Sequence, residues 1–162
     1  MKLKRNELIR LMAMCAGLVF CIIAFALFAA PFAQGRTLGT TFSGFELAFK
    51  WDSERNLMLF AGWLIILLLL IGEVFEVTLF VLAKAKRITV NYRPDSQNIN
   101  LAFIVVELIL DIMAAIFIFV TVNVFELGSL YDLGVGAIMS GIFTILAGLC
   151  IAFGRGAKYF LK

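Results

Sequence analysis

Histidine is absent from this chain of 162 residues, and charged residues of all kinds make up only 15% of it. Without histidine the sequence lacks the commonest general base, and a zinc or di-iron centre lacks its usual nitrogen ligand. The sequence also contains no phosphate-binding loop and no nucleophile spaced to meet a base. We therefore predict that the protein is not an enzyme and that it holds no metal cofactor.

Cysteine is scarce as well. The three cysteines all lie within long apolar runs, and the predicted outer loops have none, which excludes a disulfide framework there. No two of them have the Cys-x-x-Cys spacing of a metal or redox site. Cys15, Cys21 and Cys150 are best interpreted as small apolar core residues.

What the sequence has in excess is apolar residues, at 63% of the chain with a mean hydropathy of +1.04. A soluble domain of this length cannot hide so much apolar surface from water. Four apolar runs are each long enough for the roughly 20 residues that cross a bilayer core. They cover residues 8–33, 57–83, 99–125 and 133–153. We predict an all-α membrane protein, a single domain of four transmembrane helices surrounded by lipid.

The basic residues predict how this bundle is oriented. Eleven of the 14 lysines and arginines lie in the N-terminal segment, the middle loop or the C-terminal tail. By the positive-inside rule, both termini and the middle loop are cytoplasmic, and the chain is a multi-pass protein of the cell membrane. The net charge of +3 then reflects this topology, and we expect no nucleic acid partner.

Small residues form a regular pattern in the fourth run. Gly134, Gly141 and Gly148 are spaced seven apart, which places them on one stripe of a helix. Small residues let helix backbones approach closely, and this is how helices usually pack in lipid. The stripe serves either packing within one chain or self-association, and the sequence leaves both interpretations open.

The first outer loop, residues 34–55, is the longest outer segment. Within it the stretch "SGFELAFKW" alternates apolar and other residues. Alternation with a period of two, together with aromatic residues, predicts a short β-strand or an extended segment on the bilayer surface. The apolar positions expected to make contacts there are Phe45, Leu47, Phe49 and Trp51.

The layout of four spans, inner termini, a longer first outer loop and a short second one resembles that of claudin- and MARVEL-type tetraspan proteins. The "SGFELA" loop is also similar to that of small prokaryotic four-span proteins of unassigned function. The chain lacks the claudin outer-loop pattern of Trp, Gly-Leu-Trp and paired cysteines. The resemblance therefore implies the tetraspan layout and does not extend to claudin function.

Acidic residues interrupt the two middle runs. Glu73 and Glu76 are three residues apart, and Glu107 and Asp111 are four apart, so each pair lies on one face of its helix. At 1.5 Å per residue they lie about 12 to 18 Å from the cytoplasmic ends of their spans. We expect the four carboxyls to face each other away from lipid, because a central acid costs roughly 2.5–3.5 kcal/mol on insertion scales. The nearest basic partners are Arg10 and Arg155.

This acidic cluster permits several functions. Our leading hypothesis is a non-enzymatic protein that self-associates or serves as a subunit of a membrane complex. The alternative is a channel or transporter component that moves protons or hard cations past the cluster, since carboxylate oxygens suit both. A purely structural polar cluster and a docking site for a basic residue of a partner also remain open.

Overall fold

The computed structural model describes residues 5–36, 39–49, 57–85, 97–124 and 131–160. Four of its helices are long and apolar enough to cross a membrane. They are α1 (Arg5–Ala26), α3 (Leu57–Lys84), α4 (Gln97–Val124) and α5 (Val135–Phe160). In lipid the backbone must satisfy its own hydrogen bonds, so long apolar runs form helices. The prediction of a four-helix transmembrane bundle is confirmed.

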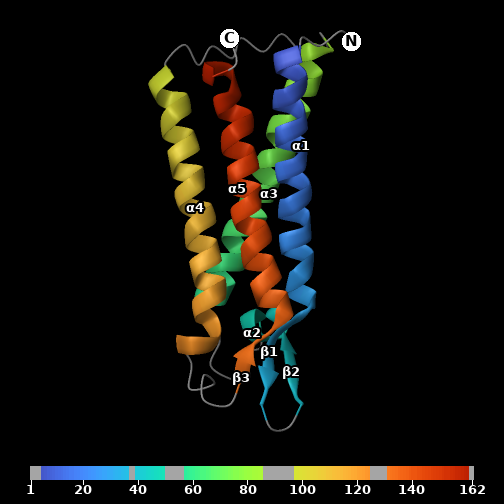
Figure 1. Ribbon diagram of the computed structural model, residues 1–162, viewed down its shortest axis with the longest axis vertical. Coiled ribbons are helices and arrows are strands. Elements are labelled where there is room, and N and C mark those ends of the chain that lie inside the picture. Colours follow the sequence, from blue (N-terminus) through green and yellow to red (C-terminus); the bar gives the residue numbers. More distant parts are fainter. Residues whose placement is uncertain (1–4, 37–38, 50–56, 86–96, 125–130, 161–162) are drawn as a thin grey trace.

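The four helices form a ring. α5 packs against α1 and α4, and α3 packs against the same two helices. α3 and α5 therefore lie diagonally across the bundle from each other. α1 begins and α5 ends at one end of the bundle, and a small sheet lies at the opposite end (Figure 1). We refer to the sheet end as the outer end, following the orientation predicted from the basic residues.

The first span ends earlier than residue 33, where the apolar run stops. α1 passes into a short 3-10 helix (Leu27–Ala29), and Ala30 is extended, with φ −82° and ψ 165°. Pro31 follows directly, and a proline disfavours the helical conformation of the residue before it. The predicted boundary was wrong because hydropathy continues past the proline whereas the helix cannot.

The small sheet joins the two outer loops. Strands β1 (Pro31–Gly35), β2 (Thr41–Ser43) and β3 (Tyr131–Leu133) pair antiparallel in the order β2-β1-β3. Arg36 and Asp132 extend this link with an exposed ion pair, Nη2 to Oδ1 at 2.6 Å. The hydrogen bond from Arg36 lowers the pKa of the Asp132 carboxyl below its usual value. The first outer loop therefore contains strand structure, as expected, but not in the residues that alternate.

The alternating stretch is instead a helix, α2 (Gly44–Phe49), and the prediction that it is extended was wrong. Ser43 begins the helix in a capping box with Glu46. Its backbone N–H and hydroxyl donate to Glu46 Oε2 at 2.7 and 2.9 Å, and the Glu46 N–H donates back to Ser43 Oγ at 3.2 Å. Phe45, Leu47 and Phe49 all pack against the core of the bundle. The fourth predicted contact, Trp51, lies outside the described residues.

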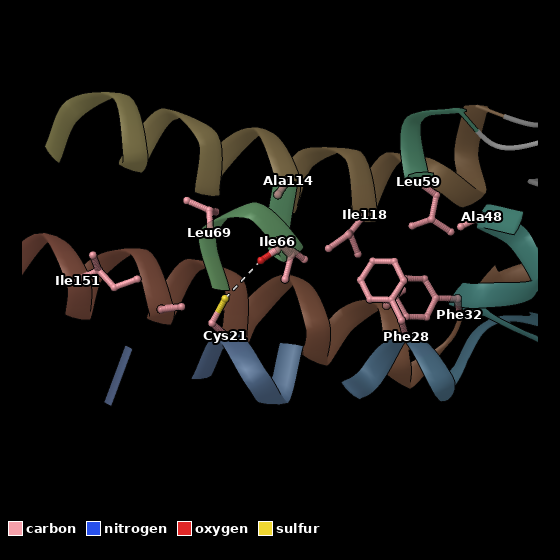
Figure 2. Close-up of a cluster of buried hydrophobic side chains, with 12 residues drawn as sticks. Cys21, Phe28, Phe32, Ala48, Leu59, Ile66, Leu69, Ala114, Ile118 and Ile151 are labelled. Atoms are coloured by element: carbon pink, nitrogen blue, oxygen red, sulfur yellow. Dashed lines mark hydrogen bonds between the residues drawn. The ribbon is translucent and has the colours of Figure 1, made fainter. Parts of the chain in front are cut away.

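The outer half of the bundle is closed by hydrophobic side chains. Phe28 and Phe32 are fully buried with ring centroids 4.7 Å apart, beneath α2. Toward the middle of the bundle, Ile66 and Ile118 are buried between the helices (Figure 2). Close packing of this kind leaves little room for water among these residues.

Candidate functional site

The predicted acidic residues come from two neighbouring helices. Glu73 and Glu76 lie on α3, and Glu107 and Asp111 lie on α4, which packs beside it. Glu73 is fully buried, and Glu107 and Asp111 are 8% and 2% exposed. Three of the four acids thus face the interior of the bundle and are shielded from lipid.

Arg155 of α5 reaches across the bundle to these acids. Its Nε donates to Glu76 Oε2 at 2.6 Å, and its Nη2 contacts the same oxygen. Its Nη1 lies 2.5 Å from Glu107 Oε2, and Nη2 lies 3.9 Å from Glu73 Oε1. One planar guanidinium therefore ties together α3, α4 and α5, which suits the forked donor geometry of arginine.

Arg10 of α1 adds a second guanidinium to the cluster, on the side that faces away from the small sheet (Figure 1). Its Nη2 lies 3.7 Å from Glu76 Oε1, and both side chains are 27% exposed. The guanidinium also lies over the ring of Phe80, 5.3 Å from its centroid. All four long helices thus contribute a charged side chain to the same layer of the bundle.

Asp111 has a different environment from the other three acids. It makes no ion pair with any residue in the described ranges, and its Oδ2 has no hydrogen-bond partner there. A Cβ added at Gly148 of α5 would lie 2.7 Å from the Asp111 Cγ and 2.9 Å from its Cβ. The carboxyl therefore occupies the space that a side chain at position 148 would fill.

The other predicted glycines are also covered by the chain itself. A Cβ at Gly141 would meet the Phe119 ring of α4, and one at Gly134 would meet the backbone of β1 at Pro31. The three glycines serve contacts within one chain, which was one of the two interpretations of the stripe. The stripe itself is therefore covered within the chain.

The charges of the cluster do not balance. Four carboxyls meet two guanidiniums, and both oxygens of Glu73 lack a hydrogen-bond partner among the described residues. An ionised carboxylate that is buried without compensation is costly by several kcal/mol. The arrangement is therefore most stable when it also holds added positive charge, of which a proton is the smallest form. Within the described residues, no group of three or more acids or cysteines is placed to hold a metal ion.

Exposure falls from one end of the cluster to the other. Arg10 and Glu76, on the side of the cluster away from the sheet, are partly exposed, whereas Glu73 and Asp111 are buried. Beyond Asp111, toward the outer end, α4 places Ala114 and Ile118 in the hydrophobic core. The polar layer is thus bordered by hydrophobic core on its outer side, and its more exposed members lie on the other side.

Two further buried polar side chains were missed by sequence reasoning. The Ser140 hydroxyl donates to the Ala24 carbonyl at 2.9 Å and joins α5 to α1, and the Thr144 hydroxyl donates to the Ser140 carbonyl at 2.8 Å. Their spacing of four, on the face of α5 that carries Gly148, was the available signal. Both hydroxyls donate their proton to a backbone carbonyl and not to a carboxyl of the acidic cluster.

Comparison with protein-family models, with curated proteins and with solved structures finds no match to this chain.

Proposed function

We propose that this chain is a non-enzymatic, multi-pass membrane protein that takes up and releases protons at the acidic cluster from the cytoplasmic side. The observation that carries this proposal is the burial of Asp111 and Glu73, because Asp111 Oδ2 and both Glu73 oxygens lack hydrogen-bond partners among the described residues, next to the more exposed Glu76. A buried carboxyl in this setting gains most from binding a proton.

A proton suits the cluster better than a hard cation does. Arg155 already lies among Glu73, Glu76 and Glu107, and its guanidinium would repel a metal ion placed between them. A hard cation also needs six or more oxygen ligands, whereas a proton needs one. Of the two ions named in the alternative hypothesis, the proposal therefore favours the proton over a hard cation.

The same geometry favours proton binding over continuous translocation. Phe28, Phe32 and Ile118 fill the outer half of the bundle, so a proton that enters from the cytoplasm meets a hydrophobic barrier. We expect the chain to respond to cytoplasmic pH and to pass no protons on its own. Self-association stays a prediction. The glycine stripe no longer supports it, because its three glycines contact other parts of the same chain. A tetraspan relationship also stays a prediction.

Proton uptake by the purified protein in nanodiscs tests the proposal. After a small acid jump, the wild type should take up more protons than a variant with Glu73→Gln and Asp111→Asn. Asp132→Asn is the matched control, because it removes an exposed carboxyl from the outer sheet. Equal uptake by the wild type and the double variant would contradict the proposal. Proton flux across proteoliposomes above that of empty vesicles would show translocation instead.

A further inference from the structure

Asp111 is set apart from the rest of the acidic cluster by its neighbours. Glu73, Glu76 and Glu107 each contact Arg155, whereas Asp111 makes no ion pair with a described residue. It is 2% exposed, and its Oδ2 has no hydrogen-bond partner in the described ranges. Of the four acids, Asp111 alone therefore combines burial with the lack of an ion-pair partner among these residues.

Gly148 has no side chain, and the Asp111 carboxyl lies in the space that a side chain there would fill. The carboxyl lies so close to the α5 backbone that an added Cβ at position 148 would be 2.7 Å from Asp111 Cγ, well inside van der Waals contact. Arg155 lies seven residues further along α5, about 10 Å away along the helix axis at 1.5 Å per residue. The carboxyl of Asp111 therefore lies against the α5 backbone at Gly148 and makes no ion pair with Arg155.

The charged and titratable groups of the acidic cluster and its surroundings come from every long helix. They are Arg10 and Cys21 on α1, Glu73 and Glu76 on α3, Glu107 on α4, and Arg155 on α5. Cys21 directs its thiol to the Ile66 carbonyl, 3.7 Å away. Glu107 lies one turn from Asp111 on the same face of α4. An ionised Asp111 would meet other carboxylates nearby, and the one guanidinium within the cluster's interior is already shared by three of them.

We infer that Asp111 carries the exchangeable proton of the cluster. Gly148 positions Asp111, because the missing side chain lets the neutral carboxyl lie directly against the α5 backbone. This inference rests on the proposed function. With the proton bound, Asp111 packs between α4 and α5, and three carboxylates remain for two guanidiniums. When the proton leaves, repulsion from Glu107 and the cost of burying the charge push the carboxyl out of its seat. Proton release thereby loosens the contact of α4 with α5 at this level.

Infrared difference spectroscopy can test this, because a protonated carboxylic acid has a carbonyl band that its ionised form lacks. In nanodiscs, the wild type should show such a band that disappears as the pH rises. Asp111→Asn should abolish the titrating band, and Glu73→Gln should retain it. Gly148→Ala should move the midpoint at least about one unit to lower pH, a tenfold loss of proton affinity, because the displaced carboxyl approaches Arg155.

Gly141→Ala is the matched control for Gly148→Ala. It introduces a similar clash between α4 and α5, against Phe119, away from the acids. Its midpoint should equal that of the wild type. A band that persists in Asp111→Asn would overturn the inference and leave the proposed function standing. Equal shifts in the two glycine variants would overturn the role of Gly148. The absence of any titrating band in the wild type would overturn both proposals. Asp111→Asn keeps the test decisive even if Gly148→Ala does not fold.

Discussion

Arg155→Ala should destabilise the folded bundle more than any other removal of one charge from the cluster. The side chain is 20% exposed and makes close contacts with Glu76 and Glu107, including 2.6 and 2.5 Å separations. A hydrogen bond between charged groups contributes about 1.5–3 kcal/mol, and removing one partner of a buried ion pair costs about 3–5 kcal/mol. We expect a loss of about 3–5 kcal/mol in the free energy of unfolding near neutral pH, on the same grounds.

Arg10→Ala is the comparison that isolates this effect. Its contact with Glu76 is longer, at 3.7 Å, and both side chains are 27% exposed. An ion pair of this kind contributes about 0–1 kcal/mol and the contact with the Phe80 ring about 0.5–1 kcal/mol, so the variant should lose about 2 kcal/mol at most. Arg155→Lys should fall between the two, because it keeps the charge but loses the fork that reaches two helices. The assay is reversible unfolding in mixed micelles titrated with a denaturing detergent.

The pH dependence of the loss in unfolding free energy tests whether the charge of Arg155 is responsible for it. As the pH falls and the glutamates become protonated, Arg155 loses its anionic partners. The difference between the wild type and Arg155→Ala should then shrink. A loss below about 2 kcal/mol at neutral pH, equal to that of Arg10→Ala, would refute the assignment of Arg155 as the central ion-pair partner. A large loss that stays constant into acid would show that packing of the arginine stem is responsible, and not its charge.

Three further outcomes follow from the packing and the topology. Gly17→Ala should destabilise the bundle by about 1–3 kcal/mol through overpacking between α1 and α5, whereas Gly72→Ala has no neighbour within 4 Å and should be neutral or stabilising in the same unfolding assay. The stabilising contribution of the Arg36–Asp132 pair is present above the usual pKa of an aspartate. It should be lost as the pH falls through the lowered pKa of Asp132, and because the pair is exposed, added salt should weaken it in a double-mutant cycle. In a cysteine-free background, a membrane-impermeant maleimide applied outside intact cells should label Asp132→Cys, and it should label Arg5→Cys only after permeabilisation. Labelling of both without permeabilisation would contradict the predicted orientation.

The sequence predicts the four long helices well because their length and apolar character are local properties. It predicts α2 poorly for an equally local reason. Phe45 and Phe49 are four residues apart, a spacing that fits one face of a strand and one face of a helix alike. The capping box of Ser43 and Glu46 was the signal that separates the two structures. Pro31 was a similar signal for the end of α1.

The acidic site is only partly readable from the sequence. The spacing of Glu107 and Asp111 on one face follows from helix geometry alone. Which helix faces them does not, because the order of helices in the ring and the rotation of each depend on contacts between distant segments. The seat of Asp111 on Gly148 and the reach of Arg155 across the bundle therefore required the structure.

The strand order β2-β1-β3 has a consequence for how the chain is made. β1 and α1 leave the ribosome before β3 and α5, with which they pack, have been synthesised. The carboxyls of α3 and α4 likewise enter the membrane before Arg155 exists to receive them. A nascent chain that stops short of α5 thus holds acids without their principal counter-charge and a first helix without a main neighbour. We therefore expect the bundle to reach its stable packing only once α5 has entered the membrane.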